Sequence, residues 1–353
     1  MTWFPRLQKL EIMDCPKLLS LPPIPWTLGP CSAEIMGVGS GFEELWYSKE
    51  HSSKLLSLSI TGKGGQDGMF WKILAFSNLA DLNELRLKNC PPLPMDHLQK
   101  LTSLKSLEIE NSSNVLSPTD SESDVTYKIP IECLSIRFCG SGEKELTQLL
   151  SHFPDLSDLA ILDCEKITRV GVVEQQQQAT RGEEEIALAA GEEAGLLLSS
   201  SITSLSFNHN HEVERFTKEQ EDALQLLTSL EYLSFLKCGK LQCLPAGLHR
   251  LSSLQTLCIQ HCEAIKSLPK DGLPTSLQFL HIIGCPSLKS LTKDGLPSSL
   301  EKLSIIDCPA LKSLPSHGLP DSLRVLHVED DGNSEELMRQ CRKLKGTIPI
   351  IRD

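Results

Sequence analysis

Residues 254–262 read LQTLCIQHC, residues 277–285 read LQFLHIIGC and residues 300–308 read LEKLSIIDC. Each nonapeptide has Leu at its first and fourth positions, Ile at its sixth and Cys at its ninth, and consecutive copies begin 23 residues apart. The alternation around positions four to six has the period of a β-strand with one buried face. A fixed period of this length predicts a repeat protein, in which each copy forms one layer of a stack.

The same frame extends over most of the chain. We count twelve repeats, and a degenerate thirteenth around Cys31 to Ile35. The fourth and sixth positions, which should point inward, are Leu10/Ile12, Leu58/Ile60, Leu85/Leu87, Leu107/Ile109, Leu134/Ile136, Leu159/Ile161, Leu205/Phe207, Leu233/Phe235, Leu257/Ile259, Leu280/Ile282, Leu303/Ile305 and Leu326/Val328. A single repeat cannot bury its own leucines, so each depends on its neighbours. The predicted fold class is an α/β solenoid, a leucine-rich-repeat horseshoe with a parallel sheet on its concave face and mostly loop or short helix on its convex face.

Eight cysteines occupy the position where such repeats carry Asn or Cys: Cys15, Cys90, Cys139, Cys164, Cys238, Cys262, Cys285 and Cys308. A small side chain at this position fits under the turn that ends the strand, and cysteine without a disulfide is among the most buried residue types. Stacked strands bring neighbouring members to about 5 Å, but their Cβ vectors should run parallel rather than toward each other. We therefore expect all eight to be reduced structural thiols.

The connections between strands vary along the chain. Leu-Pro steps favour loop over helix on the outer side of the C-terminal third, while helical returns are expected at 95–101, 143–152 and 219–227.

A Gln- and Glu-rich stretch over 172–198 interrupts the frame, and such low complexity predicts a mobile insertion. Residues 112–124 should be a second, smaller mobile loop. One domain over 1–353 should end in a cap at 329–353, with a helix capped by Ser334. The first repeat shows no cap, so we expect the natural protein to continue upstream.

Composition narrows the classes of partner. Apolar residues make up 40% and charged residues 23% of 353 positions, and the net charge is −12. An acidic chain without a clustered basic face argues against a nucleic-acid partner. No apolar run is long enough to span a membrane and no signal peptide opens the chain, which predicts a cytoplasmic protein.

The outer phrases at 268–277 and 314–323, LPKDGLPTSL and LPSHGLPDSL, resemble the leucine-rich-repeat region of plant nucleotide-binding disease resistance receptors, most closely the coiled-coil class. So does the start, where 4–12 read FPRLQKLEI and 15–18 read CPKL. The resemblance covers nearly the whole chain outside the insertion. It implies recognition of a pathogen effector or a host protein, and restraint of an upstream nucleotide-binding domain.

Motifs for chemistry are missing from the sequence. The stretch Gly62-Lys63-Gly64-Gly65 lacks the spacing and Ser/Thr of a phosphate-binding loop, so nucleotide binding is not carried over from the family. His281 and His327 should share an outward column but lie two repeats apart, about 10 Å, which is too far for one metal ion. We expect no catalytic, cofactor-binding or metal-binding residue, and no enzyme activity.

The hypothesis is therefore a protein-recognition domain, with the contact surface on the outward positions of the C-terminal strands. Several of these positions carry large apolar residues where water is expected, a pattern typical of contact sites. The candidates are Tyr232, Leu236, Phe279, His281, Ile283, Lys302, Ile306, Val325 and His327. A packing role within the full receptor remains the competing interpretation. The alternative function is a substrate adaptor of a ubiquitin ligase, against which stands the absence of an F-box-like helical module ahead of the repeats.

Overall fold

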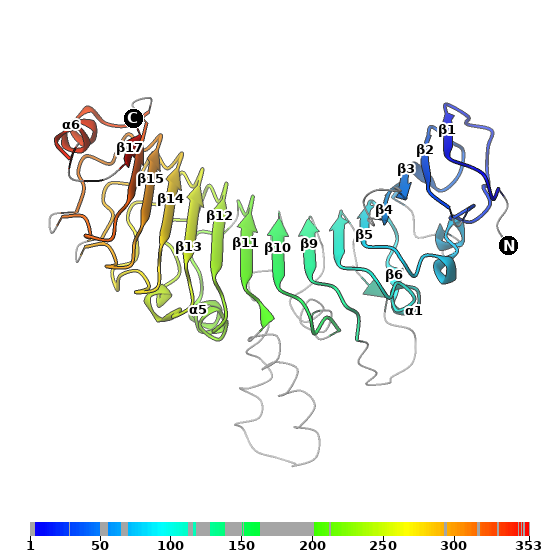
Figure 1. Ribbon diagram of the computed structural model, residues 1–353, viewed down its shortest axis with the longest axis horizontal. Helices are drawn as coiled ribbons and strands as arrows, with labels where there is room; N and C mark the ends of the chain where they lie inside the picture. The colour runs from blue at the N-terminus through cyan, green and yellow to red at the C-terminus, as the bar shows by residue number, and fades with distance from the viewer. Residues whose placement is uncertain are drawn as a thin grey trace, which may run out of the picture. The chain divides into compact units, whose positions relative to one another are not determined.

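The structure is a computed structural model, and it describes residues 4–27, 29–49, 56–64, 70–111, 116–117, 128–137, 150, 152–162, 201–211, 213–292, 295–315, 318–329, 332–344, 346, 348 and 350–352. Contacts divide the chain into two compact units, Met1–Leu156 (unit 1) and Ser157–Asp353 (unit 2). Each unit is a mostly parallel β-solenoid with few helices (Figure 1). The prediction of one domain over 1–353 stays a prediction. The expected mobile insertion at 172–198, most of 112–124 and most of the expected helix at 143–152 lie outside the described residues.

Unit 1 holds seven strands of the main sheet, in the order β1-β2-β3-β4-β5-β7-β9. Their bounds are β1 Lys9–Met13, β2 Cys31–Met36, β3 Phe42–Lys49, β4 Leu56–Gly62, β5 Glu84–Lys88, β7 Ser106–Glu110 and β9 Cys133–Arg137. The return segments carry the 3-10 helices η1 (Phe70–Ile73) and η2 (Phe76–Asn78), the short helix α1 (Met95–Leu98) and the small parallel pair of β6 (Leu93–Pro94) with β8 (Leu116–Ser117). A strand, β2, lies where a degenerate repeat is expected around Cys31 to Ile35, and it pairs in parallel with β1.

One strand of unit 1 departs from the expected parallel sheet. β3 pairs antiparallel with β2 on one side and with β4 on the other. The glycine-rich segment 37–41 makes the reversal, and Gly37 has a φ of +64° that favours glycine. Phe42, Leu45 and Tyr47 are buried, so β3 contributes to the same core as its neighbours. Because β2 and β4 run in the same direction, the parallel frame resumes after this insertion.

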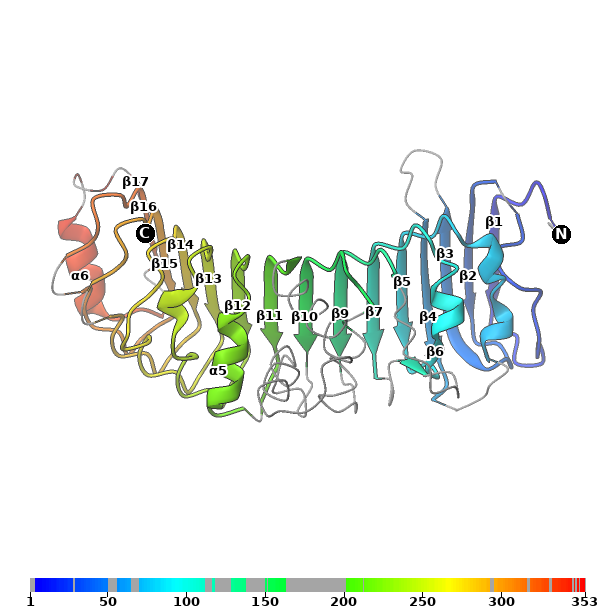
Figure 2. The same ribbon diagram turned by 90° about the horizontal axis from the view of Figure 1, so that it is seen from below.

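Unit 2 is a parallel ladder in which every pairing of its named strands is parallel. Its strands are β10 Asp158–Leu162, β11 Ser204–Asn208, β12 Tyr232–Leu236, β13 Thr256–Gln260, β14 Phe279–Ile283, β15 Lys302–Ile306, β16 Val325–Val328 and β17 Ile350–Arg352. Helix α5 (Lys218–Gln225) lies beside β12 in both views (Figures 1 and 2), and η3 (Leu248–Arg250) follows it in the chain. Between η3 and α6 (Glu335–Lys343) the described returns contain no helix, as the Leu-Pro steps predict.

Two helices that sequence signals predict are present with their caps. Thr217 caps α5 through a capping box, in which its hydroxyl accepts from the N–H of Gln220 and the Gln220 side chain accepts from the N–H of Thr217. Ser334 caps α6 by accepting from the N–H of Leu337 at 3.3 Å. The predicted helices over 219–227 and after Ser334 are therefore confirmed, within one or two residues at their ends.

The core is the stack of inward residues at the second and fourth positions of the strands. Leu280 and Ile282 of β14 are fully buried, as are Leu303 and Ile305 of β15. Serine hydroxyls connect the layers on the return side: Ser299 donates to the carbonyl of Leu277 at 2.7 Å, and the repeats before and after it make the same bond. These bonds satisfy backbone carbonyls that the returns would otherwise bury without a partner.

The cysteine column is buried where a layer covers it on both sides. Cys90, Cys238, Cys262, Cys285 and Cys308 are buried, whereas Cys15 in the first layer is exposed, which corrects the expectation for that residue. Cys139 and Cys164 lie outside the described residues. Each buried thiol of the column donates to two carbonyls; Cys262 reaches Phe235 O at 3.6 Å and Gln260 O at 3.5 Å. The thiol therefore serves as a weak hydrogen-bond donor under the turn, as well as a small apolar group.

A left-handed residue follows most of the strands. Its φ lies between 50° and 56° at Asp14, Asn89, Asn111, His209, Lys237, His261 and Asp307, and near 63° at Gly37 and Gly284. At most of these positions the N–H donates to the carbonyl of the last residue of the next strand, as His261 N does to Ile283 O at 2.7 Å. The chain thus turns out of the sheet while the ladder of hydrogen bonds continues for one more residue.

Candidate functional site

The first, third and fifth residues of the unit 2 strands point away from the core. In β14 these residues are Phe279, His281 and Ile283, and all three are half-buried while Leu280 and Ile282 between them are fully buried. The parallel register places residues of equal position side by side, about 4.8 Å apart across the sheet. Three columns of side chains therefore run across this face.

All nine sequence-predicted candidates lie on this face and are half-buried. The first column contains Tyr232, Phe279, Lys302 and Val325; the third contains His281 and His327; the fifth contains Leu236, Ile283 and Ile306. The structure thus brings all nine together on β12 to β16 of one unit. Whether they contact a partner stays a prediction.

The apolar members of the face are concentrated on β14 to β16. Ile283 and Ile306 are direct neighbours in the fifth column, and Phe279 precedes Lys302 and Val325 in the first. The smaller Ser304 lies between His281 and His327 in the third. Apolar side chains in both outer columns, on either side of His281, Ser304 and His327, make a surface on which an apolar segment of another protein can pack.

The histidines of the third column have defined neighbours. His281 Nδ1 lies 3.1 Å from Ser304 Oγ, and His327 Nε2 lies 3.5 Å from Glu329 Oε1. Burial lowers the pKa of His281 below its ordinary 6.5, and the charges of Lys302 and His327 lower it further. His281 is therefore neutral at neutral pH and accepts or donates a single hydrogen bond to Ser304. Among the described residues no three His, Cys, Asp or Glu side chains are grouped as metal ligands.

At the β12 end of the face, Tyr232 is held by its neighbours. Burial raises the pKa of its phenol, and hydrogen bonding with Cys258 raises that pKa further, while Ser234 acts in the opposite direction. Burial also raises the pKa of the Cys258 thiol. Both groups are therefore uncharged at neutral pH, so this part of the face presents polar hydrogen-bonding groups without a charge.

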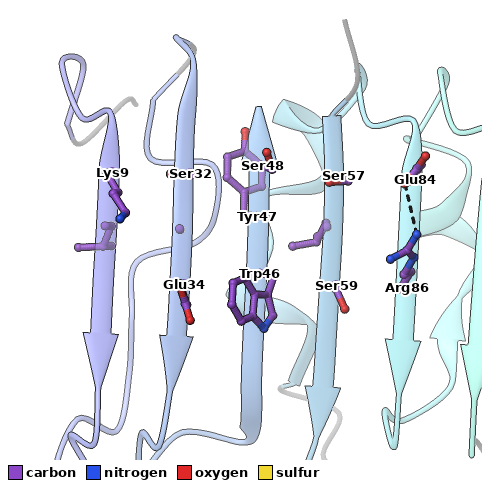
Figure 3. A pocket seen from close by; sticks show the side chains of 13 residues that line it. Lys9, Ser32, Glu34, Trp46, Tyr47, Ser48, Ser57, Ser59, Glu84 and Arg86 are labelled. Atoms are coloured by element: carbon purple, nitrogen blue, oxygen red, sulfur yellow. Dashed lines mark ion pairs between the residues drawn. The ribbon is translucent and has the colours of Figure 1, made fainter. Parts of the chain in front are cut away.

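Sequence reasoning missed a second surface feature, an open hollow of about 550 Å³ on the strand face of unit 1. Figure 3 shows Trp46 of β3 standing between Glu34 of β2 and Ser59 of β4. The residues that line the hollow are Lys9, Leu10, Ser32, Ala33, Glu34, Trp46, Tyr47, Ser48, Ser57, Leu58, Ser59, Glu84 and Arg86. The signal in the sequence is the alternation over 44–49, ELWYSK, which does not fit the repeat frame.

Among the residues that the structure describes, no helix has the length and apolar character needed to cross a membrane. No model of a known protein family matches this chain, and no curated protein matches it. The strand faces of the two units and the sequence itself therefore carry the functional argument.

Proposed function

We propose that this chain is a protein-recognition domain, and that unit 2 contacts its partner through the outward residues of β12 to β16. The observation that carries the proposal is the register of half-buried apolar side chains on one sheet face, with Ile283 beside Ile306 and Phe279 in the adjacent column. Backbone hydrogen bonds already occupy these strands on both sides, so their outward side chains are the part left for a partner.

The class of partner is proposed from the sequence resemblance. That resemblance supports the proposal that the chain is a leucine-rich-repeat horseshoe and belongs to a cytoplasmic plant immune receptor of the coiled-coil class. In that setting the face binds a pathogen effector or a host protein, and the repeats restrain an upstream nucleotide-binding domain until binding occurs. The acidic net charge of −12 agrees with a protein partner rather than nucleic acid.

The first test is the gene upstream of Met1. A nucleotide-binding module there supports the receptor, whereas an F-box supports a ubiquitin-ligase adaptor, and neither outcome depends on the face itself. The second test places Phe279→Ala and Ile306→Ala together in the full-length protein. Loss of partner binding, or activation without a partner, is the expected result.

Lys266→Ala is the matched control, because Lys266 is exposed on a return segment away from the strand face. It should leave both partner binding and restraint unchanged. Circular dichroism melts of the isolated chain should show that the double variant folds. If a folded double variant binds and restrains like the parent protein, the face is not the recognition surface.

A further inference from the structure

Trp46 is exposed in a way that the other described tryptophans are not. Its exposed fraction is 43%, against 2% for Trp26 and 5% for Trp71. The indole N–H of each buried ring donates to a backbone carbonyl, of Pro22 and Pro92 respectively. The Trp46 N–H instead donates to Glu44 on its own strand, which fixes the ring orientation while the structure leaves the ring accessible.

Small residues make the hollow around this ring. Ser32, Ser48 and Ser57 face one another on β2, β3 and β4, and Ser59 pairs with Trp46 in the adjacent row (Figure 3). Serines at these positions leave the indole standing above its neighbours on the sheet. A hollow of about 550 Å³ lies within the size range of ligand-binding clefts and accommodates a long side chain with part of its backbone.

The charges around the hollow are unbalanced. Lys9 pairs with Glu11, and Arg86 lies 3.7 Å from Glu84 and 3.3 Å from Glu108. Glu34 is half-buried beside Trp46 and makes no ion pair within 4.0 Å among the described residues. The hydrogen bond and charge of Glu11 raise the pKa of Lys9, and the charge of Glu34 helps to raise it. The charged residues that line the hollow balance, with Glu34 and Glu84 against Lys9 and Arg86. The negative excess comes from Glu11, Glu44 and Glu108, which lie beside the hollow without lining it.

We infer that this hollow binds an arginine side chain from a basic segment of a protein partner, with the guanidinium stacked on Trp46 and hydrogen-bonded to Glu34. A guanidinium is flat, which suits the open indole face, and it remains charged at all physiological pH values. Its several N–H donors match the Glu34 carboxylate and the neighbouring serine hydroxyls. The carboxylates of Glu34, Glu44 and Glu11 near Trp46 repel anionic ligands, and the polar rim disfavours an apolar one.

The site lies entirely in unit 1 and shares no residue with the face proposed above for unit 2. It therefore stands or fails independently of that proposal. The chemical difference between the two surfaces is clear, because β14 to β16 present apolar columns whereas β1 to β5 present carboxylates around one aromatic ring.

The test is calorimetric titration of the full chain with a synthetic peptide that carries two arginines separated by Gly-Ser. A second peptide has citrulline in place of arginine, which keeps the shape and hydrogen-bonding plane but removes the charge. The arginine peptide should bind more tightly, and added salt should weaken it because the contact is largely ionic. Trp46→Ala and Glu34→Gln should each weaken binding about two- to fivefold.

Glu43→Gln is the matched control, because it makes the same Glu-to-Gln change on the adjacent strand β3, at a residue that does not line the hollow. It should leave the affinity within error of the parent chain, as should Phe279→Ala on unit 2. Melting curves should show that Glu34→Gln, a substitution of nearly equal shape, keeps the fold even where Trp46→Ala alters it. No binding of the arginine peptide, equal binding of the citrulline peptide, or an undiminished affinity in Glu34→Gln overturns the proposal.

Discussion

Leu280 and Phe279 are neighbours on β14 that face opposite sides of the sheet, so truncating each should have very different effects on stability. Leu280 is fully buried and lies between Leu257 and Leu303, which are also fully buried. Layers on both sides hold these residues in place, so the space left by Leu280→Ala cannot close. We expect a loss of about 3–5 kcal/mol in the free energy of unfolding, the upper part of the range for such cavities.

Phe279→Ala removes a half-buried ring whose register neighbours are Thr256 and Lys302. Part of the ring surface is already in contact with water, so we expect a loss of about 1 kcal/mol. Urea denaturation monitored by circular dichroism measures both changes in the free energy of unfolding, from the transition of unit 2. Leu257→Ala, in the adjacent layer, should reproduce the large effect. Equal destabilisation by Phe279→Ala and Leu280→Ala would show that the facing of β14 is wrong.

Three further predictions concern the turns, the thiols and a histidine. Gly284→Ala should lower the free energy of unfolding by about 1–2 kcal/mol, because the φ of Gly284 is +63° and the new Cβ would lie 2.4 Å from Nδ1 of exposed His261. A second substitution, His261→Ala, should recover the steric part of this loss. Chemical denaturation measures both changes, and no recovery argues against the contact. Exposed Cys15 and Cys243 should react with a thiol reagent in the native state. Burial raises the pKa of Cys90 to about 12 and that of Cys341 to about 11, so these two thiols should stay protonated and unreactive. A fall in the melting temperature on adding reductant would contradict the prediction that the cysteines are reduced. The pKa of His281 is lowered in the folded state, so the unfolded chain binds more protons and stability should fall as pH drops below 6.5. His281→Asn should reduce this pH dependence in melting experiments. An unchanged dependence would show that His281 is not its source.

The inward residues of the stack could be predicted from the sequence because one rule determines them. In a strand covered on one side by a core, alternate residues point inward, so Leu280 and Ile282 identify the outward positions of Phe279, His281 and Ile283 without further information. The same rule places the whole candidate surface on unit 2. It also explains why all nine candidates lie on one face, since the register repeats from layer to layer.

The hollow in unit 1 could not be predicted in the same way. β3 carries no copy of the repeat, and its direction depends on the reversal at 37–41, which a search for a fixed period passes over. Trp46 is aligned with Glu34 and Ser59 only because β3 is antiparallel to both of their strands. Cys15 illustrates a second limit, because burial of that position depends on layers on both sides and the first layer has one.

The antiparallel insertion also has a consequence for how the chain reaches its fold. Met36 pairs with Glu44, eight positions away, whereas Leu257 and Leu280 of the parallel ladder are 23 positions apart. Closing a short loop costs less conformational entropy, and contacts that are local in sequence form faster than distant ones. The hairpin of β2 and β3 is therefore suited to act as a folding nucleus, onto which β1 and β4 can dock before the longer loops of the stack close.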